Sequence, residues 1–191
     1  MFARLSKDHS LSGLFVLAFA FSFILLLPDR AFSQYECNGD CRRDLAIART
    51  VTAKYHKEVR AGENGYVVAS GCVESPAGGM GYHYIKPSLV DLSVDAAEPE
   101  LLLYEPTGNG ERRLVAVEYF VPVIYNGQPW ISTDPPPGPI NPAPELFGQT
   151  FDGPMAGHDP MMPWHYELHV WLWKNNPNGL FASYNPTVDC P

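Results

Sequence analysis

Acidic and imidazole side chains interrupt otherwise apolar segments at three places in this chain. The residues concerned are His83, Glu118, Glu167 and His169, within GYHY, LVAVEYFVP and HYELHVWLW. Burying an unpaired carboxylate or imidazole is costly, so such groups are expected to meet partners. Imidazole nitrogen and carboxylate oxygen are ligands of zinc, copper, iron and manganese. The sequence therefore predicts one divalent transition-metal site formed by these four residues.

Alternation along segment 164–174 predicts that a ligand-binding surface lies beside this site. Successive side chains of a strand point to opposite faces, and one face of this segment is apolar, as a core requires. The other face combines proton-active groups with large aromatic rings, a composition typical of pocket walls. Its members are His165, Glu167, His169, Trp171 and Trp173. We predict that His165, Trp171 and Trp173 bind ligand there.

Spacing decides which of these groups can share an ion. Strand positions i and i+2 lie about 6.6 Å apart on one face, whereas i and i+4 lie about 13 Å apart. Glu167 with His169 is therefore the better pair, and His165 would join His169 only in a bent or helical segment. The alternative is that these groups hydrogen-bond to one another and to tyrosine hydroxyls in a polar core network.

Residues 1–33 have the pattern of a secretion signal. Two basic residues precede the uncharged run LFVLAFAFSFILLL, and Ala31-Phe32-Ser33 places small residues where signal peptidase cuts, before Gln34. The run is shorter than the about 20 apolar residues of a membrane span. We predict a secreted or periplasmic protein of residues 34–191 that forms no stable membrane association after cleavage.

The length and charge of the remaining chain limit its class. Of the 191 residues, 158 remain after cleavage, which suits one domain with a sizeable core. The precursor has 13 Lys and Arg against 21 Asp and Glu, and removal of residues 1–33 leaves a net charge of −9. Such a surface repels phosphate backbones, so nucleic-acid binding is not expected.

All four cysteines lie beyond the predicted cleavage site, and an even count in an oxidising compartment predicts two disulfides. Of the three possible pairings, the short turn between Cys37 and Cys41 favours that link, which leaves Cys72 with Cys190. A four-cysteine zinc site is the alternative, although no paired Cys-x-x-Cys motif is present.

The pattern along the chain predicts an α+β fold, with an N-terminal helix packed on a curved antiparallel β-sheet. Residues 40–60 carry apolar or small side chains at three- and four-residue steps, with Asn38 or Asp40 as the N-cap and Gly62 at the end. Later segments rich in Val, Tyr, Leu and Phe predict strands. These strands are 66–73, 81–86, 101–105, 114–125 and 164–174.

Turn-forming residues refine this arrangement. Segment 105–111 predicts a hairpin between the third and fourth strands, and Pro122 indicates that the fourth strand is an edge strand or bends there. Glycines 78, 79 and 81 predict a turn that allows close backbone approach. Residues 129–163 hold ten prolines among many apolar residues, which predicts a long ordered loop, without regular secondary structure, covering one face.

Several of these segments are similar in sequence to those of a known protein family. CVESPAGGMGYHY, LVAVEYFVP, LFGQTFDGPM and HYELHVWLWKNNPNGLF resemble a family of exported bacterial proteins of unassigned function, over residues 52–190. The resemblance implies export and implies no particular activity.

The function predicted from the sequence is binding of a metal ion or small ligand by the His/Glu/Trp face of an exported protein, with enzyme status left open. One alternative is a metal-dependent oxygenase or hydrolase that uses the same residues. A second is a structural or interaction module without a small-molecule site, using exposed apolar residues of the proline-rich loop.

Overall fold

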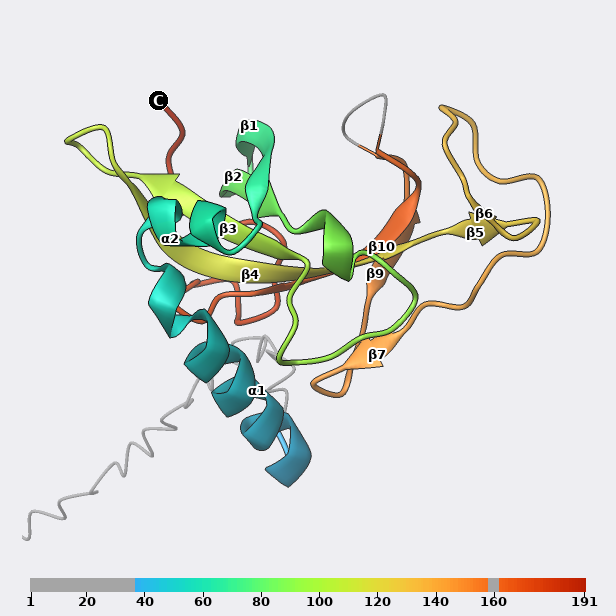
Figure 1. Ribbon diagram of the computed structural model, residues 1–191, viewed down its shortest axis with the longest axis horizontal. Coiled ribbons are helices and arrows are strands. Elements are labelled where there is room, and N and C mark those ends of the chain that lie inside the picture. The colour runs from blue at the N-terminus through green and yellow to red at the C-terminus, as the bar shows by residue number, and fades with distance from the viewer. Residues whose placement is uncertain (1–36, 158–161) are drawn as a thin grey trace, which may run out of the picture. The chain divides into compact units, whose positions relative to one another are not determined.

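The computed structural model describes residues 37–157 and 162–191 (Figure 1). The predicted signal peptide, residues 1–33, and its cleavage site before Gln34 lie outside the described residues. Among those described, no helix is long and apolar enough to cross a membrane.

A six-stranded antiparallel sheet with a helical N-terminal segment forms the fold, which is α+β as predicted. The helical elements are α1 (Gly39–Thr52), a 3-10 turn (Ala53–Tyr55), α2 (Glu58–Glu63) and a second 3-10 turn (Pro87–Leu89). The sheet, in spatial order, consists of β1 (Val67–Ser75), β2 (Gly78–Ile85), β3 (Leu101–Pro106), β4 (Arg112–Pro122), β10 (His165–Val170) and β9 (Asp152–Met155). Two small hairpins pair β5 (Ile124–Tyr125) with β6 (Gln128–Pro129) and β7 (Glu145–Leu146) with β8 (Gln149–Thr150).

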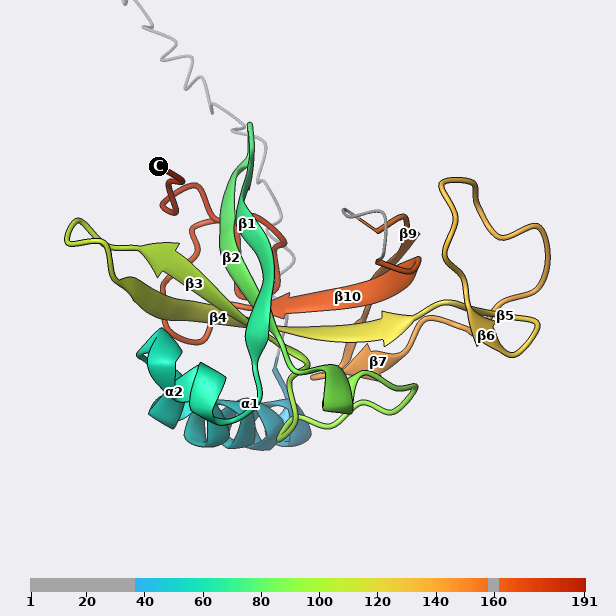
Figure 2. The ribbon, with the colours of Figure 1, turned by 45° about the horizontal axis from the view of Figure 1, so that its top comes forward.

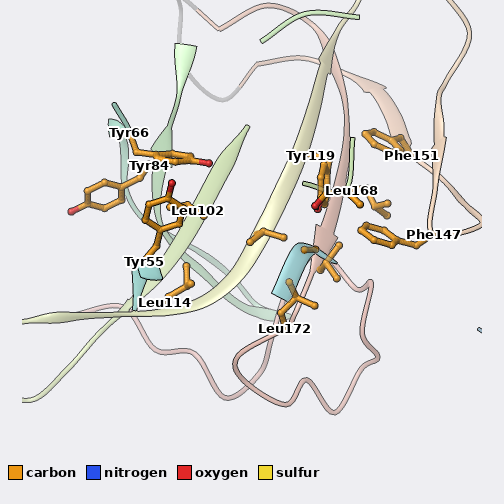
Figure 3. Packing of buried hydrophobic residues seen from close by; sticks show 14 of the residues in the cluster. Tyr55, Tyr66, Tyr84, Leu102, Leu114, Tyr119, Phe147, Phe151, Leu168 and Leu172 are labelled. Atoms are coloured by element: carbon orange, nitrogen blue, oxygen red, sulfur yellow. The ribbon is translucent and has the colours of Figure 1, made fainter. Parts of the chain in front are cut away.

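The sheet is strongly twisted and curled, with β1 and β2 running steeply across β4 and β10, and α1 and α2 along one side (Figure 2). The core on that side, here called the helix-side core, is rich in aromatic rings from the sheet, the 3-10 turn after α1 and the proline-rich loop (Figure 3). The opposite face carries a second cluster, here called the site-side core. It consists of Met80, Leu101, Leu103, Val115, Ala116, Phe120, Trp171 and Val188.

The predicted helix over residues 40–60 is interrupted. The Asn38 side chain caps α1 by accepting from Cys41 N, as predicted, but regular helix ends at Thr52 and resumes only at Glu58. Between them the backbone turns to the sheet: the carbonyl of Tyr55 accepts from the Tyr104 hydroxyl, and Lys57 forms a β-bridge with Arg113. The carbonyls of Tyr55 and His56 therefore accept hydrogen bonds from sheet residues, Tyr104 Oη and Leu114 N, in place of helical i→i+4 bonds.

The predicted hairpin between the third and fourth strands is confirmed, since β3 and β4 pair from Leu101↔Glu118 to Pro106↔Arg112. The edge-strand prediction from Pro122 is wrong, because β4 lies between β3 and β10 and ends at Pro122. The predicted turn at glycines 78–81 is also wrong, since these residues lie in β2. Their close approach is confirmed: a Cβ on Gly81 would collide with the Tyr104 carbonyl.

The proline-rich loop is ordered where it packs on the sheet. Phe147 and Phe151 enter the helix-side core, and the Phe147 ring meets Tyr119 edge-on, with 5.4 Å between centroids (Figure 3). The loop also supplies β9, contrary to the expectation that it holds no regular strand. Pro154 is accommodated because β9 is an edge strand whose pairing with β10 is irregular there.

Both predicted disulfides are present, Cys37–Cys41 and Cys72–Cys190. The second holds the C-terminal tail, in which Asn185 forms a β-bridge with Gly79 and Val188 enters the site-side core. All four cysteines are oxidised, so a four-cysteine zinc site is excluded.

Candidate metal centre

Three of the four predicted ligands lie together on the site-side face of the sheet. His83 comes from β2, Glu118 from β4 and His169 from β10, and one ligand atom of each lies within 4.8 Å of the other two. His169 is the direct cross-strand neighbour of Glu118. Among the described residues, this is the group of His, Cys, Asp and Glu side chains whose geometry could hold a metal ion.

The curl of the sheet brings these side chains together. Two strands, β3 and β4, separate β2 from β10, so a flat sheet would hold their residues about 14 Å apart. The ring centroids of His83 and His169 are instead 6.5 Å apart. The cluster therefore occupies the concave face, where side chains from non-adjacent strands converge.

The cluster is almost completely shielded from solvent. Glu118 and His169 are each 1% exposed and His83 is 8% exposed. Apolar residues of the site-side core flank it on the same strands, with Phe120 following on β4 and Trp171 at the end of β10. A low-dielectric surrounding strengthens interactions of a bound cation with these ligands.

Glu118 is the electrostatic centre of the cluster. Its Oε2 lies 3.4 Å from His83 Nε2 and 3.7 Å from His169 Nε2, and this oxygen makes no hydrogen bond to any described residue. Burial raises the pKa of Glu118 well above its usual range, and the negative charges of Glu167 and Glu100 raise it further. The metal-free site therefore favours a protonated Glu118, whereas a cation between the three ligands would stabilise the carboxylate.

Ser70 orients the ring of His83. The Ser70 Oγ lies 2.9 Å from His83 Nδ1 and 2.8 Å from the Gly71 carbonyl. Both contacts are satisfied at once only if the hydroxyl donates to the carbonyl and accepts from Nδ1–H. In that tautomer the lone pair of His83 lies on Nε2, the nitrogen that faces Glu118.

An irregularity in β1 places Ser70 there. The register between β1 and β2 shifts between Val68↔Tyr84 and Cys72↔Tyr82, so that three residues of β1 lie opposite His83. Bulges of this kind change the direction of a side chain and occur often beside functional sites. This contact could not be predicted, because a serine in an exposed strand is ordinary and the bulge depends on long-range pairing.

The fourth predicted ligand, Glu167, lies outside the three-residue group. Its Oε1 is 3.6 Å from His169 Nδ1, and its Oε2 is 3.2 Å from His165 Nε2. Alternation on β10 correctly put these side chains on one face. Alternation does not determine which of them reaches the ligand atoms of the neighbouring strands.

The two tryptophans predicted to line a ligand surface separate at the end of β10. Trp171 stays on the site-side face, buried, and donates to the Ala182 carbonyl at 2.6 Å. Trp173 lies on the other face, where its Nε1 donates to Thr52 Oγ1 at 3.2 Å and the Arg49 guanidinium stacks on its ring. The assignment of Trp173 to the face of His165, Glu167 and His169 is wrong, because the strand ends at Val170 and the chain bends, which ends the alternation.

A buried carboxylate that the sequence did not single out lies close to the cluster. Glu100 precedes β3, is 2% exposed and accepts from Phe120 N at 3.1 Å. Burial raises the pKa of Glu100 to about 8, although hydrogen bonds from backbone N–H groups oppose the shift. Two buried carboxyls, Glu100 and Glu118, therefore have raised pKa values beside the same site.

Comparisons with protein families, with curated proteins and with solved structures find no match to this chain. The resemblance to exported bacterial proteins therefore stays a prediction.

Proposed function

We propose that this protein is exported and binds one divalent transition-metal ion through His83, Glu118 and His169. The observation that carries the proposal is a buried carboxylate oxygen between two imidazole nitrogens, with one ligand atom of each residue within 4.8 Å of the others. Two imidazoles and a carboxylate are a donor set that zinc, iron, manganese and copper(II) accept. The cation would supply the positive charge that this buried group lacks.

The donor set also favours some ions over others. All four cysteines are in disulfides, so no thiolate is available to favour soft ions such as copper(I). Oxidised cysteines also support an extracytoplasmic location, because cytoplasmic thiols are kept reduced.

A second candidate function is metal-dependent catalysis, as an oxygenase or hydrolase. Three protein ligands leave coordination positions for water or substrate, as in catalytic zinc sites and two-histidine, one-carboxylate iron sites. The almost complete burial of the cluster favours a small substrate.

Elemental analysis of protein purified from its natural compartment tests the binding proposal. We expect one transition-metal ion per chain, and its identity follows from the same measurement. Chelated protein should rebind the ion in titration calorimetry, and His83→Ala, His169→Ala and Glu118→Gln should each abolish binding.

His56→Ala is the matched control, because His56 is exposed and its ring packs on Trp173 on the other face. Absence of metal from the native protein, with no rebinding, would favour a polar core network or an interaction module.

The export half of the proposal is tested separately by the intact mass of the mature protein. We expect an N-terminus at Gln34. A chain that retains residues 1–33 would contradict the proposed location and would leave the metal proposal to be judged on its own test.

A further inference from the structure

A second carboxylate and a second histidine lie beside His169. One ring nitrogen of His169, Nε2, faces Glu118 at 3.7 Å, and the other, Nδ1, faces Glu167 Oε1 at 3.6 Å. We infer that Glu167 and His165 are positioning residues that fix the His169 ring for metal binding through Nε2. This inference rests on the proposed function.

Glu167 is itself held in place by His165. The Glu167 Oε2 lies 3.2 Å from His165 Nε2, and His165 Nδ1 lies 3.0 Å from the Pro163 carbonyl. A carbonyl only accepts, so His165 Nδ1 carries a hydrogen, and the contact between His165 Nε2 and Glu167 Oε2 is a hydrogen bond through one further proton held by one of these two atoms. The His165 ring also stacks on Phe120, with 4.6 Å between centroids, and is 0% exposed.

The three side chains in these contacts come from one strand, β10. His165, Glu167 and His169 are alternate residues of one strand, so their side chains follow one another along one face. The result is a line from the Pro163 carbonyl through two side chains to His169. The three side chains, His165, Glu167 and His169, are all buried, which preorganises the line without a ligand.

This geometry assigns Glu167 a role other than that of a ligand. One of its oxygens is occupied by His165 and the other faces the His169 nitrogen directed away from the metal-binding group. Metal-ligating imidazoles commonly donate their second N–H to a carboxylate, which fixes the tautomer and raises the basicity of the ligating nitrogen. A separation of 3.6 Å is longer than a hydrogen bond, and we expect it to shorten when Nε2 binds an ion.

Cobalt(II) titration of the chelated mature protein tests the inference, because cobalt reports affinity and geometry together. Glu167→Ala should weaken cobalt binding by about 10–100-fold while one ion per chain is still bound. Glu167→Gln, whose amide oxygen still accepts from Nδ1–H, should lose less. His165→Phe, which keeps the stacking on Phe120, should also weaken binding. Glu98→Gln, an exposed carboxyl, is the control.

The visible absorption bands of bound cobalt separate positioning from a merely structural role. We expect them to shift in Glu167→Ala and to return toward the native spectrum in Glu167→Gln. Loss of stoichiometric binding in both Glu167 variants, as in His169→Ala, would identify Glu167 as a direct ligand and overturn the inference. Unchanged affinity and spectrum in both variants would overturn it as well.

A readout without metal distinguishes failure of this inference from failure of the proposed function. Nitrogen-15 NMR of the histidine rings in the chelated protein should show His169 as the Nδ1–H tautomer, and Glu167→Ala should lose that preference. If the native protein binds no cobalt, the metal proposal fails but this measurement still decides whether Glu167 orients the ring. A His169 tautomer that does not depend on Glu167 would refute the positioning role.

Discussion

Glu118 combines a cost to stability with a central position in the proposed metal site. A buried carboxyl with no hydrogen bond at Oε2 within the described residues disfavours ionisation, and a neighbouring glutamate adds repulsion. Buried carboxyls with raised pKa values cluster at functional sites. Stability and binding should therefore respond in opposite directions when this side chain is made neutral.

We predict that Glu118→Gln abolishes metal binding and stabilises the metal-free protein. At pH 8 the gain should be about 1–3 kcal/mol, because the amide does not ionise and avoids the cost of a buried charge. At pH 5 the gain should be much smaller, since the raised pKa of Glu118 keeps it protonated in the folded state. Urea unfolding in chelator at both pH values measures the difference. An equal effect at the two pH values would contradict the electrostatic explanation.

The raised pKa of Glu100 predicts that the protein loses stability as the pH rises. Its pKa rises from the ordinary 4.5 to about 8 in the folded protein. Between these two pH values the folded state binds more protons than the unfolded state. The contribution of Glu100 to stability is therefore fully present below about pH 4.5 and is lost as the pH rises through about 8. The loss is on the order of 3–5 kcal/mol, from 1.36 kcal/mol per pKa unit.

Glu100→Gln should remove this part of the pH dependence. We expect the difference in unfolding free energy between native protein and variant to change steadily from pH 5 to pH 8, in chelator, with the native protein losing stability. Glu74→Gln, an exposed carboxyl that is not among the charges acting on Glu100, should leave the profile unchanged. A native protein that gains stability over this range relative to Glu100→Gln would refute the assignment.

The elements that could be predicted are those with a local signature. The strands were recognisable from β-branched and aromatic runs, and the hairpin at 105–111 from its turn residues. Elements decided by long-range contacts were not: the predicted helix is interrupted between Thr52 and Glu58, where the Tyr55 carbonyl accepts from the Tyr104 hydroxyl. Polar residues in apolar strands indicated the candidate metal centre. The contact of Ser70 with His83 could not be predicted, because it depends on a bulge that only the pairing of β1 with β2 creates.

The close packing of the β2 glycines predicts which glycine substitutions destabilise the protein. Gly81 has φ +93°, and a Cβ there would meet the Tyr104 carbonyl, so Gly81→Ala should destabilise the protein by about 2–4 kcal/mol. Gly62→Ala is the control: Gly62 lies in α2 with no heavy atom within 4 Å of an added Cβ, and alanine is the better helix former. Its effect should range from neutral to a gain of about 1 kcal/mol. Thermal unfolding of both variants checks the contrast.

The two disulfides should contribute unequally to the whole molecule. Cys72–Cys190 spans 118 residues and Cys37–Cys41 spans 4. Loop-closure entropy in the unfolded chain then gives about 5 kcal/mol for the first and about 2 kcal/mol for the second. The paired serine variants, Cys72→Ser with Cys190→Ser and Cys37→Ser with Cys41→Ser, compare them in urea unfolding. A larger loss from the short link would contradict the entropic explanation.

The strand order also sets the time at which the metal centre is completed. β2, β3 and β4 are consecutive along the chain and adjacent in the sheet, so folding of this meander alone brings His83 and Glu118 together. His169 arrives with β10, after a long excursion through residues 123–164, and pairings this distant in sequence form late. We therefore expect the proposed metal site to acquire its affinity only when β10 docks. An ion bound at that moment would come from the compartment in which the docking takes place.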